Sequence, residues 1–331
     1  MNRKLSGERL SKYIVKVFDE KGREALEIAK KVMLEEAERL ECKEVREAIK
    51  YFMSDYWKDT TRPALLSIVC EALGGDSNTI TPIAVPLILI SGATDIHDDI
   101  IDQTKAKRGR PTVYGKFGRE IALLVGDALL FKGLMLLHEA SKKVPIEKVN
   151  IIFNLLQKAY FQLGDGEALE VSLRSKEISV EEYLKVAERK AAALEAYMRI
   201  SAILANATKE ETHALGKFGR ILGILVILGD DNADMLDPSE LINRIKNEIP
   251  PLPLIYALQE PDLRREIQSI LQGNLTNRAA VKILDLVYEA NIFNKVEKHF
   301  LNLIEEGKDI LKIISNNKLL IQILESTYPK G

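Results

Sequence analysis

Two groups of aspartates have the residue type and the spacing to do chemistry. Both follow the pattern Asp-Asp-x-x-Asp, first as Asp98, Asp99 and Asp102, and again as Asp230, Asp231 and Asp234. On a helix, residues four positions apart share a face, so the outer aspartates of a group are expected to project together. Mg²⁺ prefers oxygen ligands and typically takes one or two carboxylates plus phosphate oxygens of a substrate. The pattern therefore predicts magnesium-assisted chemistry on a phosphorylated compound.

The surroundings of the aspartates strengthen this interpretation. An apolar stretch precedes each group, at residues 83–90 and 221–228. Two such helices facing each other would make an apolar pocket with an acidic rim. Basic side chains can bind the phosphate oxygens that metal ions leave uncovered. Four basic residues follow the first group, namely Lys105, Lys107, Arg108 and Arg110.

Composition excludes several other classes of function. The 331 residues include 47 basic and 49 acidic ones, a net charge of -2 that gives no basic excess for binding nucleic acid. Two cysteines and four histidines make neither a disulfide framework nor a zinc pattern. Charged residues run through the first twenty positions, which is unlike a secretion signal. We expect a cytoplasmic protein without a membrane span, because the most apolar stretch is shorter than the roughly 20 residues that a span needs.

Apolar residues recur at helical spacing along almost the whole chain, and strict alternation typical of strands is hard to find. Residues 108–112 look like a loop, and Ser179 followed by two glutamates looks like the start of a helix. No linker or repeat divides the sequence. We therefore expect an all-α fold that forms one helical domain over residues 1–331.

The order of these motifs resembles that of the trans-isoprenyl diphosphate synthases, the polyprenyl synthetase family. The similarity covers most of the chain, from about residue 55 to residue 260. Its strongest part is His97 to Asp102 followed by Lys107 to Thr112. Weaker support comes from residues 126–130, 182–184 with Lys190, 230–234 and 252–258.

This resemblance implies a fold of the isoprenoid synthase type, with a central cavity between two helices that bear the aspartates. It also implies a homodimer and three Mg²⁺ ions that hold the diphosphate of an allylic prenyl substrate. The reaction ionises that substrate and condenses it with isopentenyl diphosphate. All six aspartates are then metal ligands or lie beside them, with Asp98, Asp102 and Asp230 as the principal ones. The basic residues that the resemblance places on substrate are Lys107, Arg108 and Lys190.

Departures from the family pattern concentrate on the second substrate, isopentenyl diphosphate. Arg62 is retained, but the family's lysine three residues earlier is Asp59 here, and Lys58 would replace it only with a local shift. A later diphosphate-binding lysine is replaced by Ile249, which leaves Lys246 as a substitute. Other family residues are replaced by Ser91, Ala191, Val226 and Ile227.

Three functions remain open on these residues. The first is a synthase that condenses an allylic diphosphate with isopentenyl diphosphate, to a C20 or longer product because Ala93 and Thr94 are small. The second is a terpene synthase-type enzyme that uses a prenyl diphosphate without isopentenyl diphosphate, which would explain the selective losses. The third is a non-catalytic subunit that pairs with an active synthase.

Overall fold

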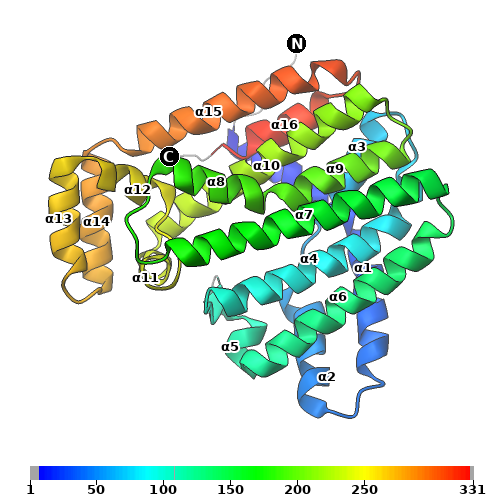
Figure 1. Ribbon diagram of the computed structural model, residues 1–331, viewed down its shortest axis with the longest axis horizontal. Coiled ribbons are helices and arrows are strands. Elements are labelled where there is room, and N and C mark those ends of the chain that lie inside the picture. Colours follow the sequence, from blue (N-terminus) through cyan, green and yellow to red (C-terminus); the bar gives the residue numbers. More distant parts are fainter. Residues whose placement is uncertain (1–6, 108, 329–331) are drawn as a thin grey trace. The chain divides into compact units, whose positions relative to one another are not determined.

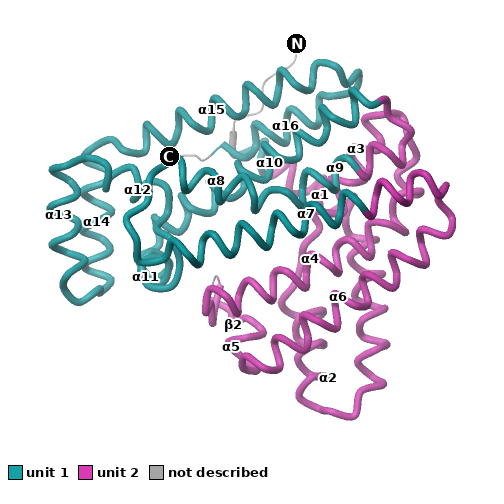
Figure 2. Tube along the Cα trace, in the orientation of Figure 1, with its two compact units in different colours: residues 1–11, 154–199, 209–331 teal, residues 12–153, 200–208 magenta. Residues whose placement is uncertain are grey.

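The computed structural model describes residues 7–107 and 109–328, and this part of the chain is built almost entirely of α-helices (Figure 1). Its one sheet is a hairpin of two-residue strands, β1 (Ala106–Lys107) and β2 (Arg110–Pro111). The all-α prediction is confirmed. Two compact units divide the chain, and Figure 2 colours them separately. The expectation of one domain over 1–331 stays a prediction.

Unit 2 comprises residues 12–153 and 200–208. Its elements are most of α1 (Gly7–Ala37), α2 (Lys43–Lys50), a π-helix η1 (Tyr51–Tyr56), α3 (Thr61–Ala72), a 3₁₀ turn η2 (Ser77–Thr79), α4 (Thr81–Ile101), the hairpin, α5 (Val113–Phe117), α6 (Arg119–Ser141) and the beginning of α7 (Ile146–Leu173).

Helix α4 carries the first aspartate group and packs along α6 (Figure 1). Pro82 lies in its first turn, where the missing amide proton costs nothing, and residues 83–90 are buried without interruption. Glycines of α6 permit this close packing. A β-carbon at Gly133 would lie 2.6 Å from Ile90 Cγ1 and 3.0 Å from the Pro86 carbonyl oxygen. The first aspartate group thus follows a buried, closely packed segment of α4.

The segment that was expected to be a loop is the β1–β2 hairpin and its exit. Gly109 has a φ of 71°, a backbone conformation that glycine adopts without strain and that lets the chain turn back here. Thr112 Oγ1 donates to the Thr104 carbonyl at 2.8 Å and accepts from the Gly115 amide at 2.9 Å, which caps α5. The hairpin is therefore anchored at its base and carries Lys107 back toward the end of α4.

Unit 1 comprises residues 154–199 and 209–331 with the first eleven. Its elements are the remainder of α7, α8 (Val180–Lys190), most of α9 (Ala192–Leu204), α10 (Lys209–Leu236), α11 (Pro238–Asn247), α12 (Leu252–Gln259), α13 (Pro261–Leu271), α14 (Asn277–Glu289), α15 (Phe293–Ile310), the 3₁₀ turn η3 (Leu311–Ile313) and α16 (Lys318–Ser326).

The predicted helix start at Ser179 is confirmed, because Ser179 and Glu182 form a reciprocal capping box at the beginning of α8. A core of α10 to α14 side chains, among them Met235, Leu254 and Ile283, is fully buried beside the second aspartate group. This packing therefore holds the end of α10 that carries Asp230, Asp231 and Asp234.

Two described helices, α6 and α10, are long and apolar enough to cross a membrane by length and composition. The same test is passed by core helices of soluble proteins. The most apolar window of α10 is 56% buried and that of α6 is 33% buried, so α6 is the less covered of the two.

Candidate active site

The first aspartate group lies at the carboxyl end of α4. Asp99 is buried, Asp98 is half-buried, and Asp102 is the buried residue that follows the last residue of the helix. The Asp102 amide donates to the Asp98 carbonyl at 2.9 Å, so the helical hydrogen bonding still reaches this residue. The three carboxylates are therefore concentrated at one helix end.

A lysine of the hairpin neutralises this group. Lys107 Nζ lies 2.7 Å from Asp99 Oδ1 and 3.6 Å from Asp98 Oδ2. Burial raises the pKa of Asp99 to about 6, although Lys107 acts in the opposite direction. Burial opposes the charge of Lys107, but Asp98 and Asp99 outweigh it and raise the pKa of this ammonium group above its usual value. Lys107, which was expected to bind substrate, thus forms ion pairs with two of the expected metal ligands.

Arg108, also expected to bind substrate, lies outside the described residues. Its neighbour Arg110 is exposed and donates to the Asp55 carbonyl. Lys58 is exposed in the segment between η1 and α3.

Arg62, expected to bind isopentenyl diphosphate, is held by two aspartates of its own unit. Its guanidinium lies 2.8 Å from Asp59 Oδ2 and 2.9 Å from Asp95 Oδ1. Asp59 is the residue that replaces the family's lysine. Asp95 stands one helical turn before the first aspartate group. The structure therefore brings Arg62 to the same helix end as this group, where the chain's own carboxylates bind it.

In unit 1, two aspartates of the second group form ion pairs with an arginine that the sequence did not point to. Arg244, from α11, lies 2.9 Å from Asp231, 3.3 Å from Asp234 and 3.1 Å from Glu248. Burial opposes the charge of Arg244, but Asp231 and Glu248 outweigh it and raise the pKa of the guanidinium further above its usual value. Arg244 of the amphipathic helix α11 is thus the cation that pairs with Asp231 and Asp234.

The three aspartates of this group differ in their surroundings. Asp231 is buried and also accepts from the Tyr183 hydroxyl at 2.5 Å and the Leu252 amide at 2.7 Å. Burial raises the pKa of Asp234 to about 6, with Arg244 acting the other way. Asp230 is exposed. Asp231 therefore links α10 to α8 and α12, while Asp230 and Asp234 have the more accessible carboxylates.

Lys190, expected to contact the allylic diphosphate, ends α8 and forms ion pairs with two glutamates of α7. Its Nζ lies 2.7 Å from Glu170 and 3.1 Å from Glu167. Lys190 and Arg244 line one small cavity of about 40 Å³. Ile227 and Ile249, which replace family residues, line the same cavity. Lys246 is exposed and is not among the described residues that line it.

Within the described residues, no group of three or more His, Cys, Asp or Glu side chains is arranged to hold a metal ion. The donor chemistry nevertheless fits Mg²⁺, which needs only one or two carboxylates when substrate phosphate supplies further oxygens. The buried Asn232 Oδ1 accepts no hydrogen bond from the described residues and adds an oxygen beside Asp231. Burial disfavours the ionised forms of Asp99 and Asp234 and raises the pKa of both. A bound cation would offset this cost by stabilising the ionised carboxylates.

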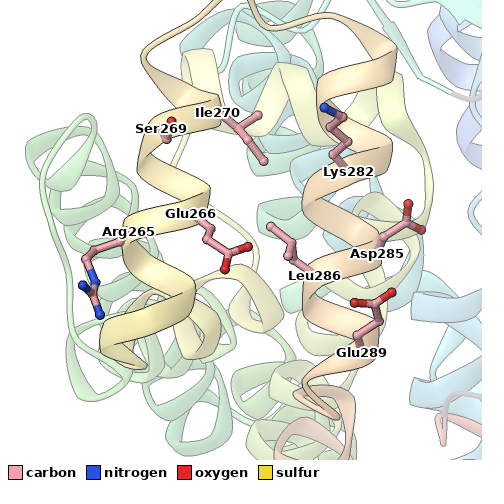
Figure 3. Close-up of a pocket in the computed structure, with 8 residues that line it drawn as sticks. All are labelled: Arg265, Glu266, Ser269, Ile270, Lys282, Asp285, Leu286 and Glu289. Atoms are coloured by element: carbon pink, nitrogen blue, oxygen red, sulfur yellow. The ribbon is translucent and has the colours of Figure 1, made fainter.

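A larger groove of about 590 Å³ lies elsewhere in unit 1, between α13 and α14. In Figure 3, side chains of both helices line it, and Glu266 and Leu286 point into the space between them. Its lining mixes charged and apolar side chains and includes none of the predicted site residues. The groove is therefore separate from both aspartate groups in the sequence and in its chemistry.

Comparison with known proteins supports the motif-based interpretation. A model of the polyprenyl synthetase family matches residues 42–288. The geranylgeranyl diphosphate synthase of Methanosarcina mazei is 31% identical over 276 residues, which cover 80% of this chain and 83% of that protein. The geranylgeranyl diphosphate synthase of Sulfolobus acidocaldarius is 26% identical over 257 residues, covering 74% and 78%.

Solved structures agree in fold. A geranylgeranyl pyrophosphate synthetase from Pyrococcus horikoshii matches with a TM-score of 0.81 at 22% identity, covering 96% of this chain and 100% of that one. A polyprenyl synthase from Caulobacter crescentus, solved with calcium and isoprenyl diphosphate, matches with a TM-score of 0.80 at 18% identity, covering 100% and 99%. At these identities the structures show the fold alone, and they confirm the predicted isoprenoid synthase type.

Proposed function

Because the chain belongs to the polyprenyl synthetase family, we propose that it is a prenyltransferase that lengthens an allylic prenyl diphosphate with isopentenyl diphosphate to a C20 or longer product. The observation that carries this proposal is the pair of aspartate groups, each set at the end of a helix and each beside a cation. The 31% identity to a geranylgeranyl diphosphate synthase over most of both chains supports the C20 product. Ala93, which is buried on α4 and small, supports a product of at least this length.

Mg²⁺ ions would be held by Asp98 and Asp102 in unit 2, with Asp99 beside them, and by Asp230 in unit 1, with Asp231 and Asp234 beside it. When bound, these ions supply stabilisation of the negative charge that develops on the leaving diphosphate. Within each unit, the neighbouring cations, Lys107 in unit 2 and Lys190 and Arg244 in unit 1, would bind diphosphate oxygens that the metal leaves uncovered. Each already forms an ion pair with a carboxylate of its own unit, so a ligand would have to exchange for an existing ion pair.

The metal roles predict the outcome of two substitutions. Asp98→Ala and Asp230→Ala should each abolish the Mg²⁺-dependent release of diphosphate, because each removes an accessible ligand oxygen from one group. Asp76→Ala, at an exposed turn in unit 2, serves as the control and should leave release unchanged. Full activity of both variants would show that the metal ligands are elsewhere.

A terpene synthase-type activity without isopentenyl diphosphate is the second candidate. The ion pairs of Arg62 with Asp59 and Asp95 favour it, since they occupy the side chain expected to bind the second diphosphate. Ile227 and Ile249 favour it as well, because they put apolar groups where the family has polar ones.

A product assay separates the candidates. The enzyme is incubated with Mg²⁺ and C10, C15 or C20 allylic diphosphate, each with and without isopentenyl diphosphate. Elongated diphosphates support condensation, whereas a hydrocarbon or alcohol formed without isopentenyl diphosphate supports the second candidate. Unchanged substrate in every reaction would contradict both and favour a non-catalytic subunit.

We further propose that the protein is a cytoplasmic homodimer. Helix α6 exposes large apolar side chains, among them Leu124, Phe131 and Met135. They are seven and four positions apart and so follow one face of the helix. A contiguous apolar face on a helix is typical of a surface that another protein covers.

A further inference from the structure

The three residues Asp59, Arg62 and Asp95 form what we call the Arg62 clamp. We propose that Asp59 and Asp95 determine substrate specificity by holding Arg62 in an internal ion-pair cluster, which weakens the binding of a second substrate that bears a diphosphate. This inference rests on the proposed function, because it assumes that Arg62 faces that substrate.

The clamp uses the part of arginine that would bind phosphate. Arg62 Nη1 donates to Asp95 Oδ2 at 3.0 Å and Nη2 donates to Asp95 Oδ1 at 2.9 Å. This two-pronged arrangement is the one by which a guanidinium binds a carboxylate or a phosphate. Arg62 Nη1 also donates to Asp59 Oδ2 at 2.8 Å. Asp95 therefore stands where a diphosphate oxygen pair would bind.

Both aspartates are held in place independently of the guanidinium. Asp59 Oδ1 accepts from the backbone amides of Thr61 and Arg62, at 2.9 and 3.2 Å, at the start of α3. The Trp57 indole donates to Asp95 Oδ2 at 3.3 Å, and Trp57 is buried and stacked on Phe52. These contacts pre-organise the acids, so an incoming anion cannot easily displace them.

The charge balance also opposes an anion. Two carboxylates share one guanidinium, so the clamp carries a formal charge of −1. Arg62 and Asp95 have about a third of their side-chain surface exposed, 34% and 37%, so the clamp is accessible rather than sealed in the core. A diphosphate that approaches would meet a guanidinium already in use and an extra negative charge. A chain of this design favours the allylic diphosphate, which the metal groups bind, over isopentenyl diphosphate.

The test frees Arg62 while preserving its surroundings. Asp59→Asn and Asp95→Asn keep an oxygen for the backbone amides and for Trp57 but remove both charges. The dissociation constant of isopentenyl diphosphate is measured by calorimetry, with a chelator present, for the full chain. We expect it to fall about tenfold or more in the double variant, the size of one charge-assisted hydrogen bond.

Two further variants make the result specific. Asp76→Asn is the matched control, because Asp76 likewise accepts from a backbone amide, that of Asn78 at 2.9 Å, and it should leave the affinity unchanged. Arg62→Gln added to the double variant should abolish the gain. Thermal unfolding verifies that each variant is folded. If the double variant does not fold, Asp59→Asn alone replaces it, and a smaller gain in affinity is expected.

The outcomes separate this inference from the proposed function. No gain in affinity, or a gain that survives Arg62→Gln, overturns the clamp even where the wild type elongates its substrate. A gain that depends on Arg62 supports the clamp even where the wild type forms no elongated product. In steady-state assays of an active enzyme, the clamp predicts a lower KM for isopentenyl diphosphate in the double variant and an unchanged KM for the allylic substrate.

Discussion

Asp99 illustrates at the scale of one residue how a functional group can reduce stability. Its pKa is raised by burial to about 6, above the value near 4 of an unfolded chain. The folded chain therefore binds more protons than the unfolded chain between about pH 4 and 6, so this group's contribution to stability improves as the pH falls through that window. Above pH 6 the ionised carboxylate costs stability in the absence of metal.

From this we predict that Asp99→Asn removes a cost of about 2–3 kcal/mol that develops in the metal-free wild type between pH 4 and pH 7, as the pKa shift implies. The lost ion pair with Lys107 lowers the stability of the variant by an amount that does not change over this range, so the gain is measured at pH 7 relative to pH 4. The gain should shrink as the pH falls from 6 toward 4, where the wild-type carboxyl is itself protonated. Denaturant unfolding with a chelator present measures both effects, and Asp309→Asn on the surface is the control. A constant gain at all pH values would mean that charge burial is not the cause.

Arg244 shows the opposite case, in which a cation is needed for stability. It joins Asp231, Asp234 and Glu248, and it is largely buried. Removing one partner of a buried ion pair leaves uncompensated charge, which typically costs about 3–5 kcal/mol. Arg244→Gln should lower the free energy of unfolding by this amount at pH 7.

Arg265→Gln is the matched control for that experiment, because the ion pair that Arg265 forms within residues 7–107 and 109–328 is with the exposed Asp262, one turn away on α13. Exposed pairs contribute about 0–1 kcal/mol, so the control should change little. Equal effects of the two substitutions would contradict the central role of Arg244.

At the scale of the elements, the sequence predicted what depends on local periodicity. The apolar stretches before both aspartate groups are parts of α4 and α10, and the capping box at Ser179 begins α8. The hairpin at residues 106–111 was missed, since strands of two residues leave no periodic signal. The π-helix at residues 51–56 was missed as well, because the sequence carries no simple signature for it.

The sequence named candidate site residues, but it did not predict the ion-pair partners that the structure gives them. Asp99 and Lys107 were both identified, but their ion pair depends on a turn that the sequence does not specify. Arg244 was missed because its role arises only when α11 folds back on α10. Motifs report which side chains are present, whereas long-range pairing decides which of them are available to a ligand.

The packing of α4 on α6 gives a prediction at this scale. Gly133→Ala should lower the free energy of unfolding by about 1–3 kcal/mol, the usual cost of overpacking, because its new β-carbon meets Ile90 and the Pro86 carbonyl. Gly164→Ala on α7 is the control, since a β-carbon there has nothing within 4 Å among the described residues. That substitution should raise stability by roughly 0.5–1 kcal/mol, because alanine favours helix. Equal losses at both positions would refute tight packing as the cause.

At the scale of the whole molecule, the exposed apolar face of α6 bears on the homodimer proposal. Phe131 is 68% exposed and Met135 57% exposed, one turn apart on this helix. Burying such side chains typically contributes about 1.5–3 kcal/mol each. Association through this face would therefore be favourable. A second copy of the chain, which would bring the same apolar face, is the partner that the homodimer proposal names.

The double variant Phe131→Glu with Met135→Glu should therefore have half the molar mass of the wild-type protein in solution. Light scattering after size exclusion measures this mass. Glutamates on both copies would bring like charges together in an interface that excludes water. Val15→Glu, at an equally exposed valine of α1, is the control and should leave the mass unchanged. A wild type that is monomeric but floats with phospholipid vesicles would show instead that α6 faces a membrane. A mass unaffected by the double variant would place the dimer interface elsewhere.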